Sequence, residues 1–332
     1  MNFIAKMLKV IKKEYKVVPD MVLIDIANRC NAQCPFCARQ LSELKRNELM
    51  SKEMFYDIIN QVKRIKSVKT IAFAAWGEPM LHPNFDEFVN YVLNLGYKVG
   101  FPTNMSLADK HMDTLLKVDF LMISVEGHDK ESYEKSRKNL NFEKVYNNIV
   151  ELDRKIKENK AKGLKVPHRE VNYLIDKNSN IKKYMELWYD YVDSVRIGPI
   201  LPAMIWNEKN KTTSLKIDDT LKKSLIKCKN RVQNMHCAMP FKSIYIRANG
   251  KLALCCSDYD IDINFGDCTE LLHSYKNNKN FKKVRDEFIT GNLNICKNCF
   301  QNFLVTKEEL FEVLPSLQKY ENDKKITIYQ NR

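Results

Sequence analysis

Three cysteines stand close together near the start of the chain. Cys30, Cys34 and Cys37 are spaced C-x-x-x-C-x-x-C within the stretch NRCNAQCPFCAR, residues 28–39. A disulfide set uses an even number of thiols, and a closed zinc site takes four protein ligands. A cubane iron–sulfur cluster normally takes four thiolates, so three would leave one iron open to a small chelating ligand. The spacing therefore indicates a cluster whose fourth ligand is a substrate or cofactor, with half of a zinc site as the alternative.

A second set of cysteines lies in the last third of the chain. Cys237 and Cys255 flank Gly250 in a C-x12-G-x4-C pattern, and Cys296 and Cys299 form a C-x-x-C pair. Four thiolates suit either an iron–sulfur cluster or a structural zinc ion. Cys256 adjoins Cys255, so we expect it to be either an alternative ligand or a donor of a hydrogen atom.

Length and composition limit the class of protein. The 332 residues, 44% of them hydrophobic, allow one large domain and a smaller one. We find no signal-peptide pattern and no apolar run of transmembrane length, which predicts a cytoplasmic protein with reduced thiols. The net charge of +14 favours solvated lysine-rich surfaces over an anionic partner such as a nucleotide or phosphosugar. No nucleic-acid motif is present, and we expect no nucleic-acid partner.

Apolar strand patterns alternate with amphipathic helix patterns over the first two thirds of the chain. This alternation predicts an α/β fold, a partial barrel of six βα units, with chemistry at the carboxyl ends of the strands. The expected strands are residues 21–27, 68–76, 98–104, 118–127, 168–176 and 193–200. The expected helices are residues 51–65, 82–96, 107–117, 129–160 with a break near Asn139, and 178–190.

The chain divides into four expected parts. A basic amphipathic helix, residues 1–19, precedes the barrel, residues 20–216. A small cysteine-rich domain, residues 217–305, contains a β-hairpin that turns at Asn249-Gly250. A C-terminal helix and tail, residues 306–332, close the chain, and we expect the tail from residue 321 to be loose.

The first cysteine motif and its surroundings resemble the radical S-adenosylmethionine (SAM) enzymes. The resemblance extends over residues 20 to 200, because further motifs follow the second, third and fourth expected strands in that family's order. These motifs are Gly77-Glu78-Pro79, Thr103-Asn104-Met105 and the segment 124–137. Two departures are Trp76, where the family usually has a glycine, and Met105, where Gly is common and which we expect to narrow the pocket.

The resemblance implies how SAM is bound and used. Its methionine part chelates the open iron, reductive cleavage gives a 5′-deoxyadenosyl radical, and that radical abstracts hydrogen from a substrate carbon. The implied cofactor contacts are the backbone at Phe36 for adenine; Gly77, Glu78 and Pro79 for the amine; Thr103 and Asn104; Ser124 and Glu126 for carboxylate and ribose; and Arg137 for the carboxylate. Reduced flavodoxin or ferredoxin is the implied electron donor.

The second cysteine set resembles the auxiliary-cluster extension called SPASM or, in its shorter form, twitch. This resemblance implies one four-iron four-sulfur cluster on Cys237, Cys255, Cys296 and Cys299. The complete cofactor set is then two 4Fe-4S clusters, one of which binds SAM.

The short extension with one cluster resembles that of the radical SAM dehydrogenases of sugars and aminocyclitols. We therefore expect oxidation of a secondary alcohol on a sugar, aminocyclitol or nucleotide-sugar-like molecule, which could be anionic. The second hypothesis is maturation or epimerisation of a ribosomally made peptide. The third, from outside the enzymes, is a basic iron–sulfur or zinc protein that binds RNA or a membrane.

Overall fold

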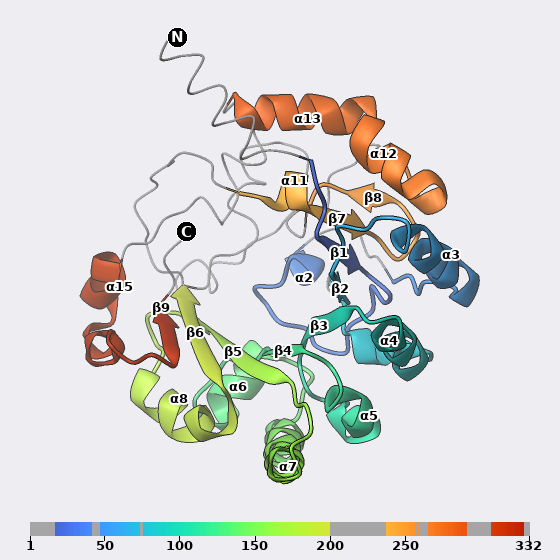
Figure 1. The fold of residues 1–332 in the computed structure, drawn as a ribbon. Helices are drawn as coiled ribbons and strands as arrows, with labels where there is room; N and C mark the ends of the chain where they lie inside the picture. The colour runs from blue at the N-terminus through green and yellow to red at the C-terminus, as the bar shows by residue number, and fades with distance from the viewer. Residues whose placement is uncertain are drawn as a thin grey trace.

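Parallel strands alternate with helices from residue 21 to residue 199 (Figure 1). The computed structural model describes residues 17–41, 47–73, 76–199, 237–255, 258, 265–290 and 307–328. The barrel strands are β1 Met21–Ile24, β2 Thr70–Ala72, β3 Lys98–Thr103, β4 Phe120–Ile123, β5 His168–Ile175 and β6 Ser194–Pro199. Each pairs in parallel with the next, which confirms the expected partial barrel of six strands.

The helices between these strands begin and end where local chemistry predicts. Ser51 caps α3 by accepting a hydrogen bond from the Met54 amide at 3.1 Å. The expected break falls at Asn139, whose φ of 73° lies in the left-handed region and separates α6 from α7. The helices are α2 Ala38–Leu41, α3 Lys52–Val62, α4 Phe85–Asn94, α5 Ala108–Leu115, α6 Lys130–Ser136, α7 Phe142–Ala161 and α8 Ile181–Trp188.

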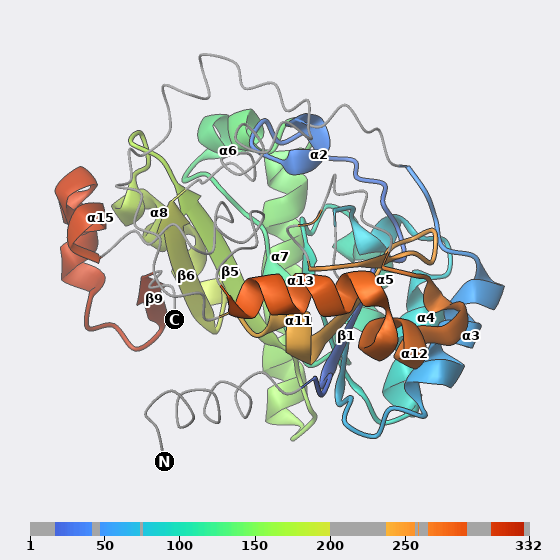
Figure 2. The same cartoon turned by 90° about the horizontal axis from the view of Figure 1, so that it is seen from above.

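Side chains alternate between the two faces of this curved sheet. One face packs on the helices, and its strand residues form the main hydrophobic core with helix residues such as Phe55, Phe88 and Trp188. The helices lie along the outside of the arc of strands in Figures 1 and 2. The strand residues that alternate with these core residues therefore face the concave side of the sheet.

The sheet continues beyond both edges of the barrel. β7 Ser243–Ile246 pairs in parallel with β1, and β8 Leu252–Ala253 returns antiparallel to β7. Gly250 makes the turn at φ 79°, so the predicted hairpin is confirmed. The sequence did not indicate that this hairpin would join the barrel sheet.

The C-terminal tail also joins the sheet, so the expectation that it is loose was wrong. β9 Ile326–Ile328 pairs in parallel with β6, after α15 Lys307–Val313. Ile326 and Ile328 are 7% and 5% exposed, whereas Thr327 between them is exposed. Burial of the two isoleucines on the helix side and pairing with β6 together order this segment.

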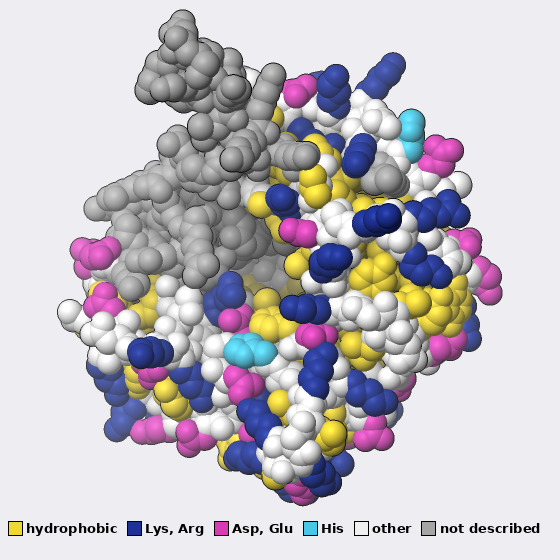
Figure 3. Space-filling model, viewed as in Figure 1, with side chains coloured by type: hydrophobic (Ala, Val, Ile, Leu, Met, Phe, Trp, Pro, Cys, Tyr) yellow, Lys and Arg dark blue, Asp and Glu magenta, His cyan; other side chains and the backbone are white. Residues whose placement is uncertain are grey.

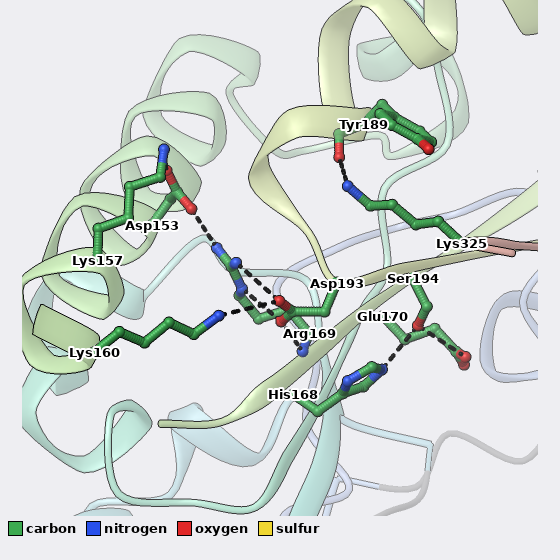
Figure 4. Close-up of polar contacts among 10 residues, drawn as sticks. All are labelled: Asp153, Lys157, Lys160, His168, Arg169, Glu170, Tyr189, Asp193, Ser194 and Lys325. Carbon is green, nitrogen blue, oxygen red and sulfur yellow. Dashed lines mark hydrogen bonds and ion pairs between the residues drawn. The ribbon is translucent and has the colours of Figure 1, made fainter. Parts of the chain in front are cut away.

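A buried charged network fixes the amino-terminal ends of β5 and β6 (Figure 4). Arg169 donates to Asp153 at 2.7 Å and to Asp193 at 3.0 Å, and its side chain is 5% exposed. Lys157 and Lys160 add ion pairs to the same two carboxylates. The guanidinium compensates both acids, which joins helix α7 to the sheet.

The cysteine-rich part contributes short helices beside the hairpin. They are α11 Met239–Lys242, α12 Leu271–Asn277 and α13 Lys279–Ile289. The predicted N-terminal helix lies outside the described residues, except for its last positions. None of the described helices is long and apolar enough to cross a membrane. On the face drawn in Figure 3, Lys and Arg side chains lie with Asp and Glu among them.

Candidate functional site

The loop that carries the first three cysteines lies against the Gly-Glu-Pro turn after β2. The Glu78 amide donates to the Arg29 carbonyl at 2.7 Å. A Cβ atom at Gly77 would collide with the backbone oxygens of Ala27 and Arg29. Glycine is therefore required at position 77 because two loops approach each other there.

The Glu78 carboxylate links this turn to the end of β3. It is almost fully buried, and it accepts hydrogen bonds from Thr103 Oγ1 at 2.9 Å and from the Asn104 amide at 2.8 Å. Burial raises the pKa of Glu78 to about 7, although these hydrogen bonds lower it. The motif residues after the second and third strands, predicted separately, are thus brought together.

Asn31 joins three loops, and the sequence did not single it out. Its amide oxygen accepts from Asn104 Nδ2 at 3.0 Å, and its amide nitrogen donates to Ser106 Oγ at 2.8 Å. Its carbonyl accepts from Asn139 Nδ2 at 3.1 Å. An asparagine between two cysteines gives no sequence signal by itself, because its partners lie far along the chain.

Met105 stands at the position where the resemblance leads us to expect a glycine. Its φ is 62°, a left-handed conformation that glycine adopts without steric cost. The Met105 side chain is fully buried in the main core, and its expected narrowing of the pocket stays a prediction. Its carbonyl accepts from Asn148 Nδ2 at 2.8 Å, which helps to hold this turn.

Arg137 lies between the fourth-strand segment and the cysteine loop. It is ion-paired with the buried Glu126, and its Nη1 donates to Cys34 Sγ at 3.3 Å. Its guanidinium carbon lies 5.5 Å from the centre of the Phe36 ring. Burial is the largest single influence on the pKa of Arg137 and lowers it, but the neighbouring Cys34 and Glu126 together outweigh burial and raise the pKa, so the guanidinium stays charged.

The three thiols lie near one another. The pKa of Cys30 is raised to about 12, chiefly by burial, and Glu78 and the other two thiols contribute in the same direction. Burial also raises the pKa values of Cys34 and Cys37. Among the described residues, no three His, Cys, Asp or Glu side chains are arranged to hold a metal ion. The donor set nevertheless fits a three-thiolate cluster site, because the Arg137 cation can compensate the charge of a deprotonated Cys34.

The remaining predicted site residues fall at the same strand ends or in the cysteine-rich part. Ser124 follows β4, and its amide donates to the Thr103 carbonyl at 2.8 Å. Pro79 begins a short 3-10 helix, residues 79–81. Cys237 and Cys255 are partly buried against the main core. Cys256, Cys296 and Cys299 lie outside the described residues, so their assignments stay predictions.

Asp25 connects the barrel to the cysteine-rich hairpin, and it too was missed. It follows β1, its amide donates to the Ile246 carbonyl at 2.8 Å, and it is 3% exposed. Burial raises its pKa to about 7, Glu48 adds to this, and the Arg247 cation opposes it. Arg247 in turn pairs with Asp258 at 3.1 Å, which fastens the loop after Cys255.

Two family models match the chain. The model of the radical SAM superfamily matches residues 24–172, and the SPASM iron–sulfur cluster-binding domain matches residues 237–300. The two matches coincide with the first cysteine loop and its strand ends, and with the second cysteine set.

Individual relatives match to different extents. A tungsten-containing aldehyde ferredoxin oxidoreductase cofactor-modifying protein of Pyrococcus furiosus is 32% identical over 89 residues, 27% of this chain and 25% of that protein. The chain thus matches only a quarter of that relative. The S-adenosyl-L-methionine-dependent 2-deoxy-scyllo-inosamine dehydrogenase of Niallia circulans is 21% identical over 299 residues, 88% of this chain and 96% of that protein.

The fold also resembles solved structures. SuiB of Streptococcus suis, bound to SAM, superposes with a TM-score of 0.60 at 14% identity, over 88% of this chain and 76% of that one. SuiB has also been solved bound to its precursor peptide SuiA, and that structure superposes with a TM-score of 0.58. At such identities the likeness describes the fold alone.

Proposed function

We propose that this chain, which belongs to the radical SAM superfamily and carries a SPASM-type domain, oxidises a secondary alcohol on a hydroxylated small molecule. Its cofactors are 4Fe-4S clusters and SAM. When bound, these cofactors supply a radical that abstracts hydrogen from carbon. Similarity to the 2-deoxy-scyllo-inosamine dehydrogenase over 96% of that enzyme is the observation that most supports an alcohol substrate.

The chain's own residues would hold the first cluster and SAM at the strand ends. Cys30, Cys34 and Cys37 are the proposed ligands, and Arg137 supplies a positive charge beside Cys34. Glu78 and Asn31 fix the loops around them through the hydrogen bonds described above. The proposed SAM contacts are those implied by the motifs, at Phe36, Gly77, Glu78, Pro79, Thr103, Asn104, Ser124, Glu126 and Arg137.

The second cluster would be held by Cys237, Cys255, Cys296 and Cys299, with Cys256 as an alternative ligand. Asp258, paired with Arg247, accepts a hydrogen bond from the Leu254 amide at 2.8 Å and so orders the turn at Cys255. Oxidation of an alcohol needs an electron acceptor after hydrogen abstraction, and a fully ligated auxiliary cluster suits that need. Reduced flavodoxin or ferredoxin is the proposed electron donor to the first cluster.

Peptide modification is the second candidate function. The likeness to SuiB, solved with its precursor peptide, favours it. In that reaction Cys256 would be the proposed hydrogen donor for an epimerisation.

A substrate panel distinguishes the two functions. Anaerobically reconstituted, reduced protein is incubated with SAM and either cyclitols and sugars or short peptides. Formation of 5′-deoxyadenosine together with a ketone from a cyclitol or sugar is the expected result. Turnover of peptides alone would overturn the proposal.

A further inference from the structure

The concave face of the sheet changes character between its two halves. On β1, β2 and β4 the concave residues include the apolar Leu23, Ala72 and Met122. On β5, β6 and β9 they include the polar Glu170, Asn172, Arg196 and Thr327, with Leu174 and Gly198 beyond them toward the carboxyl ends of β5 and β6. Their strand neighbours of opposite parity, among them Val171, Tyr173, Val195 and Ile197, lie in the main core on the helix side. We call Glu170, Asn172, Arg196 and Thr327 the polar strip.

Three members of the polar strip stand side by side across neighbouring strands. Asn172 is the register partner of Arg196, and Arg196 is the register partner of Thr327. Parallel strands lie about 4.8 Å apart, so the three side chains span about 10 Å. This length corresponds to one hydroxylated six-membered ring.

The polar strip has hydrogen-bonding groups available. The Glu170 carboxylate accepts hydrogen bonds from Arg196 Nε at 3.0 Å and from Arg196 Nη2 at 3.4 Å. Neither bond uses Arg196 Nη1, which can therefore donate to a ligand. Within the part of the chain that the structure describes, the Asn172 amide and the Thr327 hydroxyl have no partner. Asn172 is half-buried, Thr327 is exposed, and the Arg196 side chain is 39% exposed. These groups are therefore within reach of a ligand.

At the amino-terminal ends of β5 and β6, the polar groups next to the polar strip are hydrogen-bonded to one another. Ser194 Oγ donates to Glu170 at 3.4 Å and lies 2.9 Å from His168 Nε2 (Figure 4). Glu170 is 7% exposed, so its carboxylate mainly orients Arg196. Asn172 and Arg196 lie two residues closer to the carboxyl ends of their strands than Glu170 and Ser194 do, and the cysteine loop follows the carboxyl end of β1.

The charge of the polar strip identifies the ligand class. One guanidinium is neutralised by one carboxylate in a two-point contact. Such a pair, with a neutral amide and a hydroxyl, is suited to hydroxyl groups, which donate and accept, rather than to a phosphate. The geometry points to the polar strip as the surface that binds the hydroxyls of a neutral cyclic polyol. This inference rests on the proposed function and deepens it, with Asn172, Arg196 and Thr327 as determinants of substrate specificity.

The test measures binding without turnover. Reconstituted holoenzyme with SAM and no reductant is titrated with scyllo-inositol and, separately, with inositol 1-phosphate, and binding is followed by saturation-transfer NMR. We expect scyllo-inositol to bind, Asn172→Ala and Arg196→Gln each to weaken binding about tenfold, and Thr327→Val to weaken it several-fold. Arg154→Gln, on the exposed face of α7, is the matched control and should bind as the wild type does.

Asn172→Ala and Thr327→Val leave the Arg196–Glu170 pair intact, so they separate binding from folding. The inference is overturned if scyllo-inositol does not bind the wild type, if these two variants bind it unchanged, or if inositol 1-phosphate binds more than tenfold tighter. If the variants form ketone with an unchanged KM, the polar strip does not bind the substrate, but the proposed oxidation stands. If binding depends on the polar strip and no ketone forms, the polar strip binds the polyol, but the proposed oxidation is wrong.

Discussion

The first four strands and the last barrel strands use polar side chains in opposite ways. After β1, β2 and β3 the polar residues stand in loops and bond to one another, as Glu78 does to Thr103 and Asn31 to Asn104. On β5 and β6 they stand on the strands themselves, as Glu170 and Arg196 do. In the proposed function, the loops of the first half would hold the cofactors, while the strands of the second half would present side chains to a ligand on a rigid sheet.

The largest effect should come from removing the cysteine loop's thiols. Replacing Cys30, Cys34 and Cys37 by Ala should remove about half of roughly eight irons. SAM cleavage should fall at least about a thousandfold, because no iron would remain to chelate the methionine part. Iron analysis and 5′-deoxyadenosine assays measure both. Cys268→Ala is the control, and retained cleavage in the triple variant would contradict the ligand assignment.

Substitutions in the second half of the barrel should instead lower the stability of the fold. Arg169→Met leaves Asp153 and Asp193 without their shared buried cation, which should destabilise the fold by about 3–5 kcal/mol. Thermal and denaturant unfolding measure this loss. Arg154→Met, at an exposed arginine paired within α7, should leave the stability nearly unchanged, because solvent screens its ion pairs. Equal effects of the two substitutions would contradict the role given to the buried network.

Asp25, at the junction between the barrel and the hairpin, should make the stability of the fold depend on pH. The pKa of Asp25 is 3.8 in the unfolded chain and about 7 in the fold. Between these values the folded state keeps a proton that the unfolded state has released, so stability falls as the pH rises toward 7. Asp25→Asn removes this loss, worth up to about 4 kcal/mol.

The melting temperature of Asp25→Asn relative to the wild type should therefore increase from pH 5 to pH 8. Asp113→Asn, at an exposed position of α5, serves as the control. A difference that stays constant over this range would show that Asp25 does not titrate as described.

The smallest effect is expected at Asn31. Asn31→Ala removes two side-chain hydrogen bonds and should lower stability by about 1–2 kcal/mol. Its clearer consequence should be faster loss of iron to a chelator, because the cysteine loop loses its connection to β3. Asn90→Ala, on α4, is a matched control. Unchanged iron release in Asn31→Ala would show that Glu78, and not Asn31, holds the loops around the cysteines.

The sequence was sufficient for the elements that depend on local patterns. Ser51, Asn139 and Gly250 mark a helix start, a break and a hairpin turn, and each acts through residues near it in the chain. The strand-end motifs were also identifiable, because parallel strands bring their carboxyl ends together.

Features that depend on distant pairing could not be predicted. β9 is a three-residue strand whose order comes from β6, and β7 joins β1 across most of the chain. The partners of Asn31 and the burial of Asp25 likewise arise only when the strands are aligned. The polar strip depends on the register of β5, β6 and β9, which no local pattern specifies.

The most direct test of the proposed function follows a single hydrogen atom. A cyclitol that the enzyme turns over is prepared with deuterium on its carbinol carbon, and reduced holoenzyme is supplied with unlabelled SAM. We expect one deuterium in 5′-deoxyadenosine for each ketone formed, measured by mass spectrometry. A ketone without deuterium in 5′-deoxyadenosine, or deuterium transfer only from a Cα-labelled peptide, would contradict the proposed function.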